Sequence, residues 1–447
     1  MAARITWVYG AGLAAFMFFP LCGGMCGGAE AAPALSNRAD QAQSSGKSGD
    51  DRFWGLRWEN GLHYDLGISN RVARLKERHP DLEVESWHGK IGFKGQFDAA
   101  TYQTDGGLDD IPSDEGIRRA RLYTSGGFFS VRPISYKAEA EVADQEFYIR
   151  ELYLWLWEMP FIRTLKVGHF KAPMTLEGYA GSGDTLFLER ASPVEAFGPG
   201  IMYGIQAGGP NKANDSTLTL GWFGDGGQSD ISESSRSFTR AIGRATWLPW
   251  RGEEAGPVNL LHVGASAQFL YADQSEVRYR SRPESYFASR LVDTGAIDAE
   301  EAASGGLECA FLSGPWCLQS ELLGANVYRD SDNPFFWGGY VAGSWVITGE
   351  SHTYNSTLAC LGRPTPARPF SFRKGHIGAW EVASRFSHLD LSDSDVQGGE
   401  MNLMTLGLNG YLTRQLKVMV NYAWGRVREC EQEGDLRIVE GRVQYEF

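Results

Sequence analysis

The chain has 447 residues, of which 43% are hydrophobic, so it is long and apolar enough to build a large folded domain rather than a disordered chain. Its 42 Lys+Arg against 55 Asp+Glu give a net charge of -13, which excludes a surface that coats nucleic acid. Aromatic residues reach 13% and there are 55 glycines, a mixture that favours many strands joined by many turns.

Residues 1–31 have the pattern of an export signal. Arg4 supplies a short positive region, an apolar run continues to Pro20, and Ala29-Glu30-Ala31 provides a small-residue cleavage site. Lipidation at Cys22 or Cys26 is the alternative, although the residues around them fit it poorly. Beyond the signal no apolar run approaches the roughly 18 to 20 residues of a transmembrane helix, which leaves a secreted protein or a β-barrel.

Residues 32–86 are interpreted as a linker and short periplasmic segment, with the pattern of an extra strand or hairpin over 53–67. From residue 87 onward apolar and polar residues alternate, as in the last strand, where Val439 and Val443 share one face and Glu440 and Arg442 the other. The pattern predicts strands at 87–101, 117–127, 134–142, 146–157, 163–170, 199–207, 216–223, 236–248, 258–272, 307–313, 316–328, 335–346, 375–389, 399–411, 414–427 and 436–447.

These strands predict an all-β protein, a 16-stranded antiparallel transmembrane β-barrel over 87–447, with the apolar face toward lipid and the polar face toward a watery lumen. A soluble sandwich also alternates, but it turns the apolar face inward. The terminal Phe447, with Tyr445 two residues before it, is typical of the closing strand of a bacterial outer-membrane barrel. We therefore expect the protein in the bacterial outer membrane.

The connections carry further signals. The short breaks at 314–315 and 412–413 are expected to be turns on the periplasmic side, and residues 273–306 are expected to form an outer loop. Residues 347–374 are also expected on the periplasmic side, where so long a segment is unusual. Residues 172–199 are too long for a hairpin loop and contain apolar side chains, so an inward-folded constriction loop is expected. Cys317 and Cys360 would lie on the same side and are the one pair to test, the alternative being unrelated thiols.

Four segments of the chain are similar to one known family. They are residues 117–122 (IRRARL), residues 165–173 (LKVGHFKAP) with Leu188-Glu189-Arg190 following, residues 345–350 (WVITGE) and residues 378–381 (GAWE). In these stretches the chain resembles the phosphate-selective porin O and P family of outer-membrane channels. The resemblance implies a barrel, usually a homotrimer, whose inward loops form a narrow zone lined by Arg and Lys. It implies passive diffusion of small anions, with phosphate or polyphosphate as the preferred class and without catalysis, a cofactor or a metal.

The candidate pore-lining residues fall into three groups: Arg118, Arg119 and Arg121; Lys166; and Arg278, Arg280 and Arg282. Arg119 and Arg121 share a strand face opposite Leu122, and an arginine facing lipid at mid-membrane costs about 2–4 kcal/mol, so both are predicted to face the lumen. Arg118 breaks the alternation and is expected near the mouth or in a bulge. Lys166 follows the basic position that the resemblance implies before the constriction loop.

Arg278, Arg280 and Arg282 recur at period 2 and point the same way if the stretch is extended. The resemblance implies that such a row forms a ladder for oxyanions, which a guanidinium binds through two parallel hydrogen bonds. Two alternatives stay open. The strand arginines are structural ties to wall carboxylates such as Glu151 or Glu381, or the row is a solvated charge run quenched by Glu276 and Glu284.

Two positions depart from the family pattern: Gln96 stands where an Arg is common, and His169 occupies a basic position of the fifth strand. The alternative function is therefore a general, weakly selective or cation-preferring porin. A barrel enzyme or an adhesin is a third class, but the four histidines considered have no diagnostic neighbourhood, no His-Glu-x-x-His spacing occurs and the outer loops do not repeat.

Overall fold

The computed structural model describes residues 52–59, 61–68, 87–129, 133–143, 146–224, 237–252, 256–273, 276–429 and 432–447. The predicted export signal, most of the predicted linker and Cys430 lie outside these ranges. Before the barrel, β1 (Arg52–Trp58) and β2 (Leu62–Ile68) form an antiparallel hairpin, and β2 pairs with the start of β3 (Trp87–Thr104). The hairpin covers the stretch where the sequence has an extra-strand pattern.

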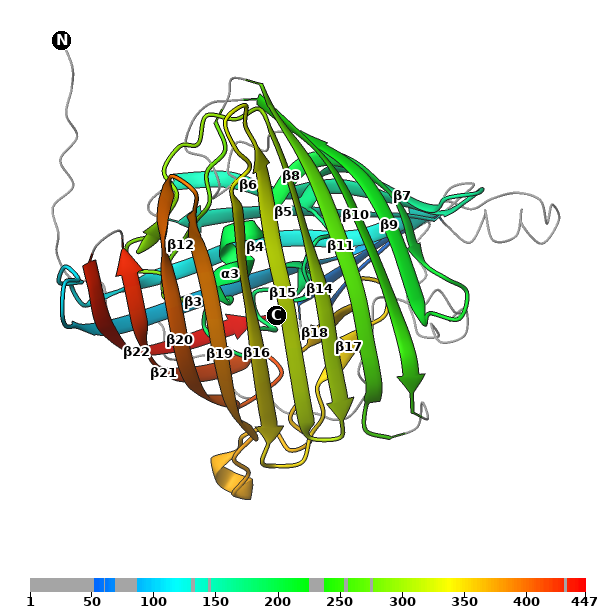
Figure 1. Cartoon of the computed structure of the whole chain (residues 1–447). Coiled ribbons are helices and arrows are strands. Elements are labelled where there is room, and N and C mark those ends of the chain that lie inside the picture. The colour runs from blue at the N-terminus through cyan, green and yellow to red at the C-terminus, as the bar shows by residue number, and fades with distance from the viewer. Residues whose placement is uncertain are drawn as a thin grey trace, which may run out of the picture. The chain divides into compact units, whose positions relative to one another are not determined.

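Sixteen antiparallel strands form a closed barrel, as predicted. Each strand pairs with its neighbour in chain order, and β22 pairs with β3 to close the ring (Figure 1). After β3 the strands are β4 (Asp114–Phe129), β5 (Pro133–Ala143), β6 (Glu146–Met159), β7 (Arg163–Lys171), β8 (Ile201–Pro210), β9 (Ser216–Gly224), β10 (Ser237–Arg251), β11 (Asn259–Asp273), β14 (Glu301–Ser313), β15 (Trp316–Tyr328), β16 (Phe335–Val346), β19 (Ala379–Asp393), β20 (Val396–Tyr411), β21 (Leu416–Glu429) and β22 (Gln432–Glu446).

The two faces of the barrel wall differ in chemistry. On β4, Ile117 and Leu122 are exposed on the outside, whereas Arg119 and Arg121 are buried on the inside. Large apolar side chains are exposed on most of the other strands, and stacked rings such as Trp316 on Trp345 lie near strand ends. An apolar outer face with aromatic residues near its edge is the arrangement that lipid requires. Among the described residues, no helix is long and apolar enough to span a membrane.

The strand ends define two rims. The C-terminal rim is the one at which Phe447 follows β22, and residues 314–315 and 412–415 make short connections there. The opposite rim carries the connections after β3, β7 and β11. Residues 347–378 also connect strands at the C-terminal rim, so the long segment predicted on that side is present.

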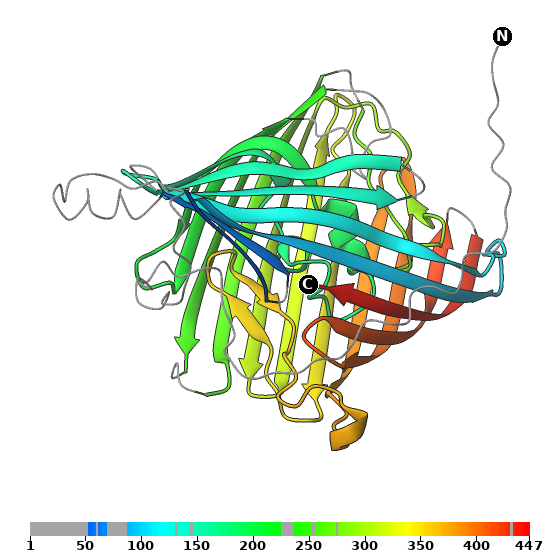
Figure 2. The same ribbon diagram turned by 180° about the vertical axis from the view of Figure 1, so that it is seen from behind.

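Two connections and the first part of a third fold into the barrel (Figures 1 and 2). The constriction segment, residues 172–200, contains α2 (Leu176–Tyr179) and α3 (Ser192–Phe197). Residues 276–300 contain β12 (Arg280–Ser281) and β13 (Val292–Asp293), and residues 347–378 contain β17 (Thr353–Asn355), β18 (Cys360–Gly362) and the 3-10 helix η1 (Phe372–Lys374). Their apolar residues pack on inward-facing wall residues, so the core lies inside the barrel. The predicted inward constriction loop is confirmed.

Several strand boundaries differ from the prediction by one to six residues, and two of these differences have a clear local cause. The strand predicted at 307–313 begins at Glu301, because residues 301–306 pair with β11 even though their small side chains show no apolar alternation. The strand predicted at 375–389 is Ala379–Asp393, because Gly375 and Gly378 have φ of 64° and 79° and end a turn there. Both differences arise where glycine and other small residues weaken the period-2 signal.

Candidate functional site in the barrel lumen

Polar wall side chains hold the backbone of the constriction segment. From β22, Arg442 Nη1 donates to the carbonyl of Leu188 at 2.6 Å, and from β21, Lys417 Nζ donates to the carbonyl of Thr185 at 2.9 Å. On the other flank, both carboxylate oxygens of Glu321 on β15 accept from backbone amides at the start of α2, each at 2.8 Å. The segment is therefore fixed across the lumen from several strands.

Glu189 on this segment is shared by three arginines. Arg118 Nε donates to it at 2.9 Å, Arg442 Nη2 donates at 2.8 Å, and Arg119 Nη1 lies 3.6 Å away. Burial alone raises the pKa of this carboxyl, but the three guanidinium groups outweigh it and hold the pKa of Glu189 well below its usual range. Glu189 is therefore ionised at neutral pH and ties the segment to β4 and β22.

A β-bulge explains how Arg118 and Arg119 both reach the lumen. On β3, Gln96 pairs with Arg119 whereas Phe97 pairs with Ile117, so Arg118 is the extra residue of β4. A bulge re-aims the extra side chain, and here it reaches Glu189 on the constriction segment. The structure thus places Arg118 in the bulge that its broken alternation suggested.

Beyond Arg119 the lumen charges alternate in sign along β4, β5 and β6. Arg121 lies 3.0 Å from Glu141, which also accepts a 3.0 Å hydrogen bond from Arg150. Lys137 is bonded to Glu151 and lies 2.9 Å from Glu139. The alternative that the strand arginines pair with Glu151 or Glu381 is wrong in its partners. The carboxylates that face them are Glu189, Glu139 and Glu141. The cross-strand register decides which side chains meet.

The row Arg278, Arg280 and Arg282 does not continue as a long strand, since β12 is only Arg280–Ser281. Arg278 forms two hydrogen bonds to Asp293, of 2.7 and 2.5 Å, and Arg282 Nη1 donates to Glu195 of α3 at 3.1 Å. Arg280 is buried and pairs in backbone register with Asp293. These carboxylates were not anticipated, because they lie on separate elements of the lumen.

Glu284, expected to quench the arginine row, has a different role. It is bonded to Arg385 and accepts from Ser387 at 2.6 Å, both on β19, and it accepts from the amide of Ser192 at 3.1 Å. This carboxylate therefore fastens residues 276–300 both to the wall and to the start of α3.

Tyr286 brings two of the predicted groups together. The guanidinium carbon of Arg118 lies 3.8 Å from the centre of the Tyr286 ring, and that of Arg282 lies 5.9 Å from it. Cations over an aromatic face are attracted by its quadrupole. Sequence reasoning missed Tyr286, for which the only signal was its position four residues after Arg282.

The remaining predicted site residue, Lys166, stands apart from the arginines. It is buried, and its Nζ lies 4.0 Å from the ring centre of Tyr153, 4.5 Å from that of Phe170 and 5.0 Å from that of Trp155. It therefore sits among aromatic rings near the wall. His169, the other departure on this strand, stacks on Tyr203 with ring centres 4.3 Å apart.

Gln96 joins the arginine cluster through hydrogen bonds. It accepts from Arg119 Nη1 at 2.7 Å, and its Nε2 donates to Gln444 at 2.7 Å and to the Ser182 carbonyl at 3.2 Å. A neutral amide at this position thus links β3, β4, β22 and the constriction segment without adding a charge.

Solvent reaches the lumen charges unevenly. The side chains of Arg150, Lys137 and Arg118 are 25, 23 and 18% exposed, and Arg282 is 25% exposed. By contrast Arg244 with Glu308, and Arg385 with Glu284, are at most 2% exposed. We call the first group, along β4 to β6 and the adjoining part of residues 276–300, the open side of the lumen. The second group, along β10 to β19, is the closed side.

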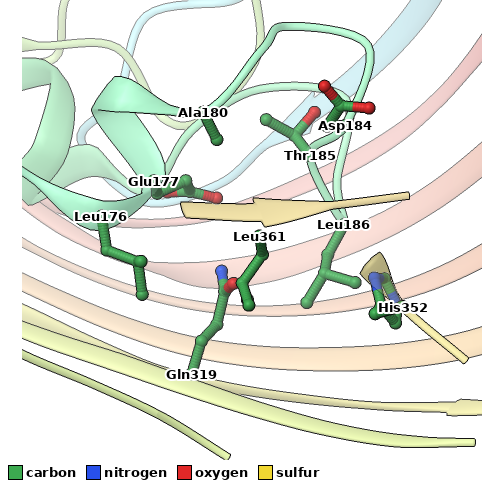
Figure 3. Close-up of a pocket in the computed structure, with 9 residues that line it drawn as sticks. All are labelled: Leu176, Glu177, Ala180, Asp184, Thr185, Leu186, Gln319, His352 and Leu361. Atoms are coloured by element: carbon green, nitrogen blue, oxygen red, sulfur yellow. The ribbon is translucent and has the colours of Figure 1, made fainter. Parts of the chain in front are cut away.

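The closed side is filled where the constriction segment meets residues 347–378. His352 Nε2 lies 2.5 Å from Glu381 on β19, and Arg244 Nη2 donates to the carbonyl of Ala359 at 2.7 Å. A small pocket of about 10 Å³, room for about one water molecule, remains in this region, and Figure 3 shows its lining residues. Glu177, Leu361 and His352 are among its lining residues. Within the described residues no group of His, Cys, Asp and Glu could hold a metal ion.

The two cysteines singled out by the sequence both lie in this region. Cys317 and Cys360 are buried in the same apolar cluster, and both are free thiols. Burial in apolar surroundings raises the pKa of the Cys360 thiol to about 12. The bridge considered between them is therefore absent, although their placement near one another agrees with the predicted side.

Comparison with known proteins decides the family. Residues 89–447 match the family model described as phosphate-selective porin O and P. The chain belongs to this porin family. The match covers all but the first two residues of the barrel, and it confirms the resemblance found in the sequence.

Two relatives and two solved structures are similar to this porin. An uncharacterized protein of Caulobacter vibrioides is 28% identical over 73% of this chain and 65% of its own length, and Porin O of Pseudomonas aeruginosa is 25% identical over 43% and 50%. The chain thus spans less than two thirds of either relative. An anion-selective porin from Comamonas acidovorans has a TM-score of 0.51 at 12% identity, covering 80% of this chain and 99% of that one. The outer membrane channel DcaP of Acinetobacter baumannii has a TM-score of 0.50 at 12% identity, covering 81% and 97%. Family and fold together establish a barrel of the porin type.

Proposed function

We propose that this porin conducts small anions by passive diffusion, with phosphate or polyphosphate as the preferred class. The observation that carries the proposal is the series of partly exposed cations on the open side. Arg282 and Arg118 flank Tyr286, and Arg150 and Lys137 follow on the far side of Arg121. An anion that leaves bulk water meets N–H donors at each of these positions, which replace part of its hydration shell.

Arginine chemistry supports an oxyanion as the permeating species. A guanidinium has five N–H donors in a planar fork, and a carboxylate occupies two of them at most in a bidentate contact. Arg118 uses Nε and Nη2 for Glu189, at 2.9 and 3.3 Å, and its guanidinium carbon lies 3.8 Å from the centre of the Tyr286 ring. A passing phosphate exchanges with such carboxylate partners, so that binding is strong enough for entry and weak enough for release.

A general, weakly selective or cation-preferring porin is the second candidate, and one observation favours it. Carboxylates alternate with the cations on the open side, since Glu139, Glu141, Glu151 and Glu189 all lie within ion-pair distance of a Lys or Arg. If this balance decides the potential along the path, the fold is kept and the anion preference is lost.

We further propose that residues 1–31 direct export and are removed, and that the barrels assemble as homotrimers in the outer membrane. Family membership supports the location. The trimer rests on the family to which the chain belongs, since the resemblance to that family implies a homotrimer. Analytical ultracentrifugation in detergent tests the assembly, and the N-terminal sequence of the purified protein tests the cleavage.

The zero-current potential of the purified protein in a planar bilayer, across a tenfold KCl gradient, tests the proposed function. The expected result is a potential of anion-preferring sign, with a chloride current that falls when phosphate is added at low concentration. Anion preference without block removes the phosphate preference from the proposal. A potential near zero, or of cation-preferring sign, establishes the second candidate.

A further inference from the structure

The segment of residues 367–377, which we call the rim segment, is exposed, basic and aromatic. Phe372 is 91% exposed and Phe370 and Ile377 are also exposed, with the two phenylalanine rings 4.6 Å apart. Its other exposed side chains include Arg368, Arg373 and Lys374. The segment contains no acidic residue, although the chain as a whole carries a net charge of -13. Apolar and cationic side chains are thus gathered at one place on an acidic protein.

The rim segment is tied to the lipid-facing side of the barrel wall. The indole Nε1 of Trp380 on β19 donates to the carbonyl of Ile377 at 2.9 Å. Trp380 precedes the buried, lumen-facing Glu381, so by strand alternation it shares the outer face with the exposed Val382. A second tie is the hydrogen bond from the amide of Phe370 to the carbonyl of Leu412, at 2.7 Å. These contacts hold the segment beside the outer surface of the wall.

The position of η1 places the segment at the edge of the membrane. Figures 1 and 2 show η1 projecting past the strand ends at the C-terminal rim. At this rim the apolar outer surface gives way to the level of the lipid headgroups, where aromatic and basic side chains are favoured together. Phe372 and its basic neighbours therefore lie at the depth where an interfacial anchor acts.

We propose that the rim segment binds anionic phospholipid in the leaflet at the C-terminal rim. Phe370 and Phe372 enter the boundary between headgroups and acyl chains, while Arg368, Arg373 and Lys374 contact the headgroup phosphates. The partner is a lipid surface because the segment continues the lipid-facing girdle at Trp380 and carries charge of the opposite sign to the phosphates. This inference does not depend on which ions the channel conducts.

Native mass spectrometry of the purified, delipidated full chain tests the proposal, with phosphatidylglycerol and phosphatidylcholine titrated in detergent. The test variant is R368Q/R373Q/K374Q. The matched control is R426Q/R428Q/R437Q, which removes three exposed positive charges at the opposite rim. The wild type is expected to prefer phosphatidylglycerol. The test variant should lose this preference by roughly tenfold or more, because each basic residue near an anionic surface contributes about a fivefold change in binding. The control should keep it.

Hydrogen exchange of the rim segment in nanodiscs gives a second readout. Amides of 368–377 should exchange more slowly in phosphatidylglycerol nanodiscs than in phosphatidylcholine nanodiscs, and F372S should reduce the difference. If exchange is equal in both lipids, or if the test variant keeps the wild-type lipid preference, the proposal is wrong. Equal exchange means that the segment extends into water and is open to a soluble partner. Conductance and heat-resistant migration should match the wild type in every variant, which separates this proposal from that of the ion path.

Discussion

Glu189→Gln removes a carboxylate that Arg118, Arg119 and Arg442 share, and it leaves the three guanidinium groups in place. Glu189 is 17% exposed and lies at the start of the open side, so its charge acts on ions that pass Arg118. The substitution is nearly isosteric, and the amide oxygen still accepts one of the hydrogen bonds. We expect the ion path to become more cationic and the anion preference to rise.

The size of the effect follows from Coulomb's law. A unit charge about 7 Å from a permeating ion in water changes the energy of that ion by about 0.6 kcal/mol. Because the change is favourable for an anion and unfavourable for a cation, the two differ by about 1.2 kcal/mol. The permeability ratio should therefore rise roughly sevenfold, since about 1.4 kcal/mol corresponds to a factor of ten.

The assay is the zero-current potential across a tenfold KCl gradient, compared with that of Glu284→Gln. Glu284 also joins an inward segment to an arginine, but the pair of Glu284 and Arg385 is at most 2% exposed on the closed side. Each substitution weakens the ion pairs of one largely buried carboxylate, and breaking a buried pair costs about 3–5 kcal/mol, so stability alone does not distinguish the two variants. If Glu189→Gln leaves the zero-current potential unchanged, or if Glu284→Gln shifts it equally, the permeating ions do not pass along the open side of the lumen.

Three further results are expected. Replacing four predicted arginines by Gln should lower the anion preference, while the barrel keeps its heat-resistant migration in detergent gels. These are Arg119, Arg121, Arg280 and Arg282. If the variant loses that migration but keeps its anion preference, the four arginines are structural ties. Burial lowers the pKa of His352, but the neighbouring Glu381 raises it more, so the pKa lies above the ordinary value of about 6.5. The ion pair of protonated His352 with Glu381 therefore stabilises residues 347–378 fully below about pH 6.5. This stabilisation is lost as the pH rises through the raised pKa. Limited proteolysis of this segment should therefore increase with pH in the wild type, and a His352→Gln variant that keeps the same pH dependence would contradict the assignment. Leu122→Arg places a charge on the lipid-facing side and should lower the free energy of unfolding in vesicles by about 2–4 kcal/mol, and an unchanged denaturant midpoint would show that Leu122 does not face lipid.

The barrel itself was predictable from the sequence because lipid and water impose opposite demands on alternate residues. Arg119, Leu122 and Phe447 each carry that signal locally, so the strand number and the facing of both arginines followed without long-range information. The signal weakens where residues are small: Glu301 to Gly306 lack alternation, and the start of β14 was missed by six residues.

The partners of the site residues were not predictable in the same way. Which carboxylate faces Arg121 depends on the register between β4 and β5, and which faces Arg282 depends on how α3 lies inside the barrel. Glu189, Glu195 and Asp293 lie on segments whose inward path is set by tertiary packing rather than by local periodicity. Sequence reasoning therefore named some of the lumen cations, missed others such as Arg150 and Lys137, and misassigned the anions that balance them.

The contacts of the constriction segment also bear on how the barrel is assembled. β3 and β22 are the first and last strands of the barrel, and their pairing closes it. On the inside of that junction, Gln96 of β3 bonds to the carbonyl of Ser182 and Arg442 of β22 bonds to that of Leu188. One internal segment thus bridges the two ends of the barrel, and it can make both contacts only once they have met. The element that narrows the pore therefore also secures the final step of barrel closure, so a variant that loosens it is expected to accumulate as an open, unclosed sheet.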